Sequence, residues 1–329
     1  MPSANSMPDQ NQLQDTLLAI DGRGYKAYKD LRGSYQFAGF TLHIDHVQGD
    51  PFAAPSRLRV EVAQDRAGYP AATYANQSRT TALCTYLATQ FAQQCQQRRT
   101  KSGSGKSGLI EIDTPGQQIL ARTCVHVDAT RVEARFAVGL PAQGRRILGR
   151  QAAQLLCEDV PAIVEAALHY AQNDAATIER YMQVAEDADF LRTQLSARGL
   201  VAFVAEGSLL PRRSGVDDHP LADGAVPFKT PDSLRVEFSL PNAGTITGMG
   251  IPQGVTLIAG GGFHGKSTLL SALERGVYNH IPGDGRELVV CDPTACKIRA
   301  EDGRRVEGVD ISPFIDNLPY GRDTRAFGT

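Results

Sequence analysis

The chain has 329 residues, of which 42% are hydrophobic and 21% charged, and its formal net charge is -2. This balance excludes nucleic-acid binding through an overall positive field, so any such contact must come from local basic clusters. No apolar run approaches the roughly 20 residues of a membrane span, and residues 1–14 are polar, without a signal-peptide core. Six cysteines without a Cys-x-x-Cys pair indicate reduced thiols. We therefore expect a cytoplasmic protein that makes no membrane contact.

Helices and strands follow one another through the first 200 residues. Residues 1–12 are small and polar, and we expect them to be disordered because they cannot bury enough apolar surface to fold. The elements after them are predicted from hydrophobic periodicity and from turn residues such as Gly and Pro. They are helix 13–31, strands 35–47 and 57–62, helix 77–98, strands 109–113, 118–128 and 131–140, and helices 147–169 and 174–198.

A basic loop follows the helix over 77–98. Its glycines and hydroxyl residues predict a flexible hairpin that could lie along a phosphate backbone. The alternative is an ordinary solvated surface loop, which is what an isolated run of charges usually is. The candidate nucleic-acid contacts in this loop are Arg98, Arg99, Lys101 and Lys106.

The same loop contains Gly105-Lys106-Ser107, which resembles the end of a phosphate-binding loop. We reject that interpretation because the pattern needs another glycine five positions earlier, where Thr100 stands. Arginines, rather than a hydrophobic strand, also precede the loop. A second basic pair, Arg212 and Arg213, either holds phosphate or nucleic acid or belongs to a surface turn, and the sequence favours neither. Further strands are predicted over 200–205, 234–240 and 288–291.

The stretch 260–268 fits the pattern of glycine, four residues, glycine, lysine and a hydroxyl residue, which is that of a P-loop. The apolar run 254–259 before it is expected to be a buried parallel strand. Leucines at helical spacing after it predict a helix over 267–275. The predicted nucleotide-binding residues are Gly260, Gly261, Gly262, Phe263, His264, Gly265, Lys266, Ser267 and Thr268.

The chemistry expected of this loop is nucleotide binding with ATP and Mg²⁺ as cofactors. Glycines let successive backbone N–H groups converge on a phosphate, and the start of the helix adds partial positive charge. Lys266 is expected to reach the β- and γ-phosphates, Ser267 to bind Mg²⁺, and Thr268 to donate its hydroxyl to the α-phosphate.

Eight blocks of the sequence, with the P-loop the most specific, resemble the predicted ATPases of the ABC class, a soluble family that does not consist of transporter subunits. These blocks are 47–56, 103–109, 132–136, 144–152, 198–218, 260–270, 276–287 and 309–319. The resemblance implies an α/β protein, with an α+β N-terminal domain particular to the family over 13–170 and an ABC-type P-loop domain over 171–329, after the tail at 1–12. For the full-length form it also implies a homodimer with head-to-tail ATP-binding domains, and it implies binding of nucleic acid, especially single-stranded RNA.

The chain departs from the family pattern after the P-loop. From Lys266 to Thr329 we find no signature serine and no apolar strand that ends in Asp-Glu. A C-terminally truncated ATPase is therefore expected, with an unknown catalytic residue, which binds ATP but hardly hydrolyses it because the groups that position the attacking water are missing. The alternative is a nucleic-acid-binding module whose P-loop senses ATP without hydrolysis. A small-molecule kinase fits less well, because its P-loop usually stands near the start of the chain.

Overall fold

The computed structural model describes residues 7–99, 103–221, 223–262, 264–298, 303, 305, 307–315 and 317–328. They form two compact units, residues 1–293 and 294–329. The helices are α1 Gln10–Ala19, α2 Gln64–Ala67, α3 Gln77–Gln97, α4 Gly149–Gln154, α5 Val160–Leu168, α6 Ala175–Leu195 and α7 Lys266–Arg275. Short 3-10 helices span Tyr25–Leu31, Ala71–Tyr74, Tyr170–Gln172, Ser196–Arg198, Asp232–Leu234 and Pro319–Gly321, and a π turn spans Leu155–Asp159.

The strands of the chain are mostly short, and every pairing between them is antiparallel. They are β1 Gly33–Gln36, β2 Thr41–His46, β3 Ser56–Ala63, β4 Ile110–Glu111, β5 Gln118–Ile119, β6 Val125–Val127, β7 Arg131–Val138, β8 Ala142–Gln143, β9 Arg146–Ile147, β10 Leu200–Ala205, β11 Arg235–Leu240, β12 Gly244–Pro252, β13 Asn279–His280 and β14 Val289–Cys291.

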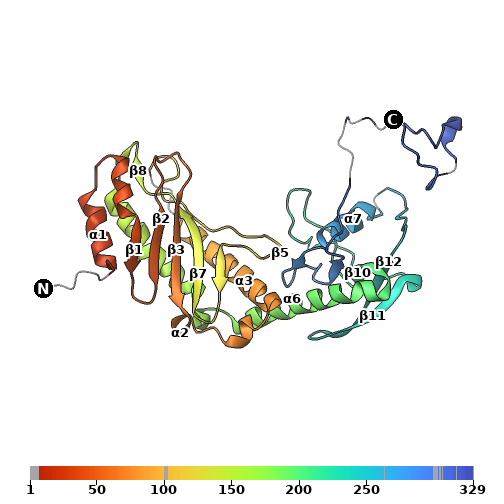
Figure 1. The fold of residues 1–329 in the computed structure, drawn as a ribbon, viewed down its shortest axis with the longest axis horizontal. Coiled ribbons are helices and arrows are strands. Elements are labelled where there is room, and N and C mark those ends of the chain that lie inside the picture. Colours follow the sequence, from red (N-terminus) through yellow and green to blue (C-terminus); the bar gives the residue numbers. More distant parts are fainter. Residues whose placement is uncertain are drawn as a thin grey trace. The chain divides into compact units, whose positions relative to one another are not determined.

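The N-terminal part is built on a six-stranded sheet with the order β1-β2-β3-β7-β4, in which β6 also pairs with β7. Alternation in β3 buries Leu58, Val60 and Val62 on one face, as the sequence predicts for a half-exposed strand. Helix α3 lies along that face (Figure 1), where the ring of Phe91 packs 5.1 Å from that of Phe136 in β7. The mixed α/β class expected from the sequence is confirmed here.

The first helix differs from its prediction at both ends. It begins at Gln10 because Asp9 caps it: the Asp9 carboxylate accepts from the Gln12 amide, and the Gln12 side chain accepts from the Asp9 amide, each at 2.9 Å. It ends near Ile20, and the chain turns through Gly22 at a φ of 71° before it resumes as a 3-10 helix. Residues 10–12 are therefore helical, whereas residues 1–6 lie outside the described part.

Residues 103–108 of the basic loop do not form the flexible hairpin that the composition predicts, and residues 100–102 lie outside the described part. The Ser104 amide donates to the Ala142 carbonyl at 2.7 Å, and the Lys106 amide donates to the Pro51 carbonyl at 2.9 Å. A side chain at Gly105 would place its Cβ 2.3 Å from the Pro51 oxygen. The described part of the loop, residues 103–108, is thus held closely against two neighbouring turns.

The region after residue 174 is a three-layer arrangement of helix, sheet and helix. The four-stranded sheet has the order β11-β12-β10-β14. Phe203 of β10 faces α6, where it packs with Leu191 and Leu195, whereas Val204 faces α7 and shares a core with Ala272. Successive side chains of β10 therefore serve opposite layers, as expected of a strand covered on both sides.

Two elements join this region to the N-terminal part of the chain. Strand β5 pairs with β13, so that Gln118 lies opposite His280. Helix α6 spans both regions (Figure 1): Ile178 and Met182 belong to the N-terminal core, and Leu191 belongs to the core of the second sheet.

The second unit, residues 294–329, is small and largely exposed. Its described residues include an antiparallel bridge between Val309 and Phe327. Across the described residues of the whole chain, none of the helices combines the length and the apolar character needed to cross a lipid bilayer.

Candidate nucleotide-binding site

The glycine-rich stretch connects β12 to the start of α7. Gly260 has a φ of +153° and Gly265 a φ of +81°, both conformations that side chains other than glycine rarely adopt. Gly265 precedes the first residue of α7, and among the described residues no side chain caps this helix. The first-turn N–H groups of α7 are therefore available to an external acceptor such as a phosphate oxygen.

The side chains of the predicted site are arranged around this turn. The Lys266 ammonium folds back over the loop and donates to the carbonyl oxygens of Gly260 and Gly261, at 2.7 and 2.5 Å. The imidazole of His264 lies over Gly261, where an added Cβ would come within 3.1 Å of the ring. Ser267 is exposed and Thr268 is half-buried, whereas Phe263 lies outside the described residues.

A pocket of about 740 Å³ opens beside the loop. One wall comes from the P-loop and the start of α7, and the other from the connector between β10 and β11. Its lining residues are Leu210, Pro211, Leu221, Gly224, Ala225, Val226, Pro227, Phe228, Lys229, Ile258, Ala259, His264, Gly265, Lys266, Thr268 and Leu269. This volume lies in the range of cofactor and ligand sites. The lining is mostly apolar, with Lys266 and Thr268 at the P-loop end and Lys229 on the connector, and no carboxylate is among its described residues.

The predicted buried parallel strand over 254–259 is wrong. Strand β12 ends at Pro252, and residues 253–259 form neither a strand nor a helix. The side chains of Val255 and Leu257 are 84% and 86% exposed, while Ile258 turns toward the pocket. The apolar pattern predicts burial, but burial needs a neighbouring strand or layer, and the described residues provide none beside this segment.

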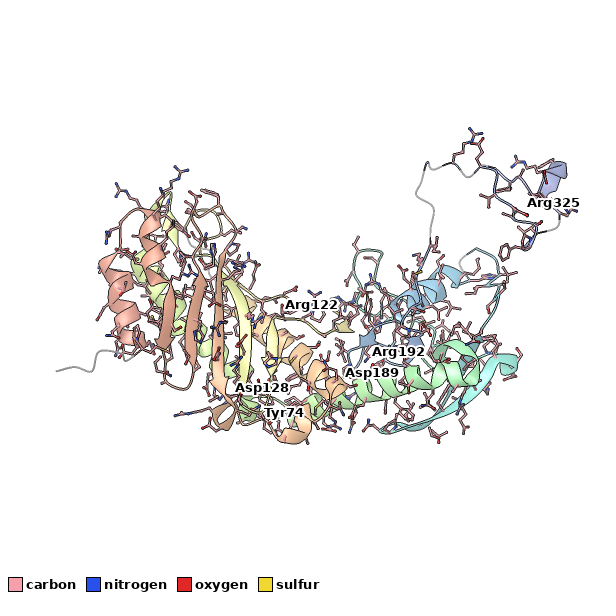
Figure 2. All side chains as sticks on the ribbon, in the orientation of Figure 1. Tyr74, Arg122, Asp128, Asp189, Arg192 and Arg325 are labelled. Carbon is pink, nitrogen blue, oxygen red and sulfur yellow. The ribbon has the colours of Figure 1, made fainter. Side chains whose placement is uncertain are left out.

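The far end of α7 is firmly held. The Gly276 carbonyl accepts from the Cys291 amide at 2.8 Å and from the Arg192 guanidinium at 3.4 Å. Arg192 also donates to Asp189 at 2.8 Å, one turn earlier on α6, and Figure 2 labels both side chains. Burial raises the pKa of the Cys291 thiol to about 12, so this thiol stays protonated in its packed position. The helix is thus anchored at its C-terminal end and open at the end that faces the P-loop.

The two residues of the basic pair at 212–213 have different surroundings. The Arg212 side chain is only 8% exposed, and its guanidinium meets the Asp284 carboxylate at 2.6 Å. The Arg213 side chain is 57% exposed and lies 3.8 Å from Asp217. The structure therefore encloses Arg212 and leaves Arg213 as the accessible member of the pair.

One of the other predicted cations, Lys106, follows a glycine that lies beside an aromatic ring, Phe52, which the sequence did not point to. Arg99 and Lys106 are exposed, Arg98 ends α3 and donates to Gln94, and Lys101 lies outside the described residues. Phe52 is 67% exposed. Its ring lies 3.1 Å from the position of a Cβ on Gly105, immediately before Lys106. The available signal was an aromatic residue between two prolines in the loop 49–56, a position with no core to join.

A glycine-rich turn that runs into an uncapped helix with the sequence Lys-Ser-Thr defines a P-loop domain. Comparison with known families supports this class and makes it more specific. The family model for the P-loop domain of ABC ATPases matches residues 174–329, and the model for the N-terminal domain of ATPases of the ABC class matches residues 10–171. The chain belongs to the ABC-class ATPases, with the N-terminal domain followed by the P-loop domain.

One relative among curated proteins is an uncharacterized protein of Methanocaldococcus jannaschii. It is 33% identical to this chain over 139 residues, which are 40% of this chain and 31% of the relative. The match therefore spans about a third of the length of that relative.

Proposed function

We propose that this chain binds ATP together with Mg²⁺ at residues 260–268. The observation that carries the proposal is the uncapped N-terminus of α7 behind a loop whose only described cation, Lys266, bonds to the loop's own carbonyls. On binding, the ammonium would exchange these neutral carbonyls for phosphate oxygens, which are stronger acceptors because they are charged. The N–H groups of the first turn would bind the phosphates at the same time.

The remaining residues fit the other parts of the ligand. Ser267 is exposed beside the first turn, where its hydroxyl can hold Mg²⁺, and phosphate oxygens complete the coordination. Within the described residues no cluster of three His, Cys, Asp or Glu could bind a metal by itself. Thr268 faces the pocket and suits the α-phosphate, while Pro211 and Phe228 offer apolar surface for the base. Bound Mg²⁺ supplies charge neutralisation of the phosphates.

Binding is proposed to exceed hydrolysis in this 329-residue chain. Water attack needs a group that orients the nucleophile, and none of the described residues that line the pocket is a carboxylate. In ABC-class proteins two ATP-binding domains stack head to tail, and we extend this to a homodimer that forms when ATP is bound. Light scattering with and without Mg-ATP tests this extension, and a mass that does not change with ATP contradicts it.

The test of the nucleotide site compares two lysines that each follow a glycine and precede a serine. Calorimetry with Mg-ATP should show binding by the unaltered chain and a loss of about tenfold or more in Lys266→Ala, because a hydrogen bond to a charged group contributes about 1.5–3 kcal/mol. Lys106→Ala is the matched control and should bind as the unaltered chain does. Equal binding by both variants would overturn the proposal.

A second proposed function is binding of single-stranded nucleic acid, RNA above all, at the loop that contains Lys106. The exposed ring of Phe52 lies beside Gly105. The side chain of Arg145, 84% exposed and bonded to Asp50 at 3.1 Å, extends from a nearby turn. An aromatic ring flanked by cations suits stacking of a base with contacts to the phosphate backbone. Arg98, Arg99 and Arg213 are further proposed contacts. In the alternative reading, the P-loop senses ATP and regulates this binding without hydrolysis.

Fluorescence anisotropy with a labelled single-stranded RNA and with the same RNA as a duplex tests this second function. Stacking on aromatic rings contributes about 1–3 kcal/mol per base, so Phe52→Ala should weaken single-strand binding by about fivefold or more. Lys106→Ala should reduce the salt dependence, and Arg180→Ala, at an exposed arginine of α6, should change neither. If Phe52→Ala and Arg180→Ala bind alike, the loop is an ordinary surface loop.

A further inference from the structure

Three ionisable side chains are buried together behind the nucleotide pocket. The side chains of Arg212, His280 and Asp284 are 8%, 1% and 0% exposed. The Arg212 guanidinium meets one carboxylate oxygen of Asp284 at 2.6 Å, and the His280 ring meets the same oxygen at 2.8 Å. Arg212 also donates to the Asp284 carbonyl at 2.9 Å. The three side chains are called the buried triad below.

The Asp284 carboxylate is held between the Arg212 guanidinium and the His280 ring. Burial alone would raise the pKa of Asp284, but the hydrogen bond and charge of His280 and the charge of Arg212 outweigh it and lower that pKa. Arg286 lies beside them, where burial and the charge of Arg212 lower its pKa to about 10. A buried ion pair that loses one partner leaves an uncompensated charge, which is strongly unfavourable. The triad is therefore a stiff connection between the segments that carry it.

The triad contacts the end of the P-loop helix α7 through His280. The second ring nitrogen of His280 lies 3.4 Å from the carbonyl oxygen of Arg275, the last residue of α7. Because α7 begins at Lys266, a displacement of its last turn moves the residues proposed to bind phosphate.

The triad is also connected to the opposite wall of the pocket, through Arg212. Arg212 directly follows Leu210 and Pro211, which line the pocket. The Arg286 guanidinium donates to the Leu210 carbonyl at 3.0 Å, and the Leu209 amide donates to the Gly285 carbonyl at 2.8 Å. The turn that contains Asp284 thus fixes the wall at 210–211 with respect to α7.

The N-terminal region reaches the triad through β5. The Gln118 side chain donates to one carboxylate oxygen of Asp218 at 2.9 Å, and the other oxygen lies 3.5 Å from the Arg212 guanidinium. The Ile281 amide donates to the Gln117 carbonyl at 3.0 Å, which extends the pairing of β5 with β13. A change in the N-terminal region at β5 can therefore be transmitted to both pocket walls through a few polar contacts.

We propose that the buried triad positions the two walls of the nucleotide pocket and that Gln118 couples them to the N-terminal domain. This inference rests on the proposed ATP site and adds its regulation: a conformational change at β5 alters ATP affinity, and ATP alters the stability of the β5–β13 contact by the same factor. Arg212, His280 and Asp284 are positioning residues, since none of them lines the pocket.

The main test uses Gln118→Ala, which removes one side-chain contact and keeps the β5–β13 backbone bonds. Its ATP affinity in calorimetry should fall by about fivefold or more, with a thermal unfolding midpoint close to that of the unaltered chain. Gln117→Ala is the matched control, because Gln117 accepts from the Ile281 amide with its backbone carbonyl, which the substitution keeps. Asp218→Asn should weaken ATP binding as well, and the double variant Gln118→Ala/Asp218→Asn should bind about as weakly as either single variant.

A second measurement separates coupling from simple loss of structure. Hydrogen exchange at the Ile281 amide should slow when Mg-ATP binds to the unaltered chain, and this response should be lost in Gln118→Ala while both proteins remain folded. Unchanged ATP affinity in Gln118→Ala, in a chain whose binding still depends on Lys266, overturns the coupling and leaves the ATP site intact. If the unaltered chain binds no ATP, the proposed function and this inference fail together.

Discussion

Two loops of this chain contain the tripeptide Gly-Lys-Ser, and the structure gives them different surroundings. In the loop at 105–107, the Lys106 amide donates to the Pro51 carbonyl, and Ser107 is 5% exposed. In the loop at 265–267, the lysine follows a glycine with open space around it, and Ser267 is exposed at the start of α7. The first loop uses its polar groups to bond to neighbouring segments of the chain. The second leaves the N–H groups at the start of α7 and the Ser267 hydroxyl available to a ligand.

The comparison shows that a Gly-Lys-Ser tripeptide does not by itself form a phosphate-binding site. A phosphate needs N–H groups without a protein acceptor, and these exist where a glycine turn precedes a long helix. At 105–107 no such helix follows, and the turn closes on Pro51 and Ala142 instead. The rejection of a second P-loop at the sequence level agrees with this geometry.

The largest predicted contrast is in stability. Gly105→Ala places a Cβ 2.3 Å from the Pro51 oxygen at a φ of +62°, and should lower the free energy of unfolding by about 3 kcal/mol, because steric crowding and a left-handed conformation each cost on the order of 1–2 kcal/mol. Gly262→Ala, with nothing within 4 Å, should lower it by less than about 1 kcal/mol. Urea unfolding measures both, and equal losses would remove the distinction between the loops.

The serines sharpen the comparison. The Ser107 hydroxyl accepts from the Ala142 amide at 3.0 Å and donates to the Ser104 carbonyl at 2.6 Å. Ser107→Ala should therefore cost about 1–3 kcal/mol of stability by leaving buried groups unpaired, with ATP binding unchanged. Ser267→Ala should show the reverse, an unchanged unfolding midpoint and a loss of the Mg²⁺ dependence of ATP binding. Calorimetry with and without Mg²⁺ decides, and a stability loss in Ser267→Ala would contradict the prediction.

Much of the fold follows from local sequence, and the exceptions have identifiable causes. Helices α3 and α6 and strand β10 are confirmed within a few residues, because their periodicity, caps and glycine stops agree. The prediction of a buried strand over 254–259 is wrong because burial depends on neighbouring elements, which a local sequence pattern does not encode. The close packing of residues 103–108 was missed because glycine predicts freedom in an isolated chain, while here it permits close approach of backbones.

The site was only partly accessible to sequence reasoning. The P-loop pattern located the turn, its lysine and its helix, all of which the structure places together. The connector that forms the second wall of the pocket, including Phe228, has no sequence signature because it is apolar and irregular. The partnership of Arg212 with Asp284 joins residues 72 positions apart, and contacts of this kind need the fold before they can be recognised.

Low pH should lower the stability of the folded chain by protonating Asp284, which lies in the buried triad. Its pKa is lower in the folded state than the value of about 3.9 for a free carboxyl group. The carboxylate therefore contributes stability that is fully present above the unfolded pKa and is lost as the pH falls through the folded pKa. As the pH falls from about 5 to about 2, the unaltered chain should therefore lose stability more steeply than Asp284→Asn. Asp232→Asn, at a fully exposed side chain, should follow the unaltered chain.

The smallest effect is expected in the exposed run before the P-loop. Leu257→Ser should change the free energy of unfolding by less than about 0.5 kcal/mol, as is usual for surface positions, because the side chain is 86% exposed. Leu195→Ala, at a side chain 1% exposed in the core beside β10, should cost about 2–5 kcal/mol. A large loss in Leu257→Ser would mean that the run is covered in solution, and the two positions would no longer differ.

Helix α6 is a continuous helix of 21 residues that gives its first half to one core and its second half to the other. If either core unfolded, one half of α6 would lose its packing partners. We therefore expect both cores to unfold together in one cooperative thermal transition. A fragment that begins at Asp174, where the second family match starts, would expose the apolar side chains of Ile178 and Met182 to solvent. The sequence boundary between the matches is therefore not a boundary at which the molecule can be divided without cost.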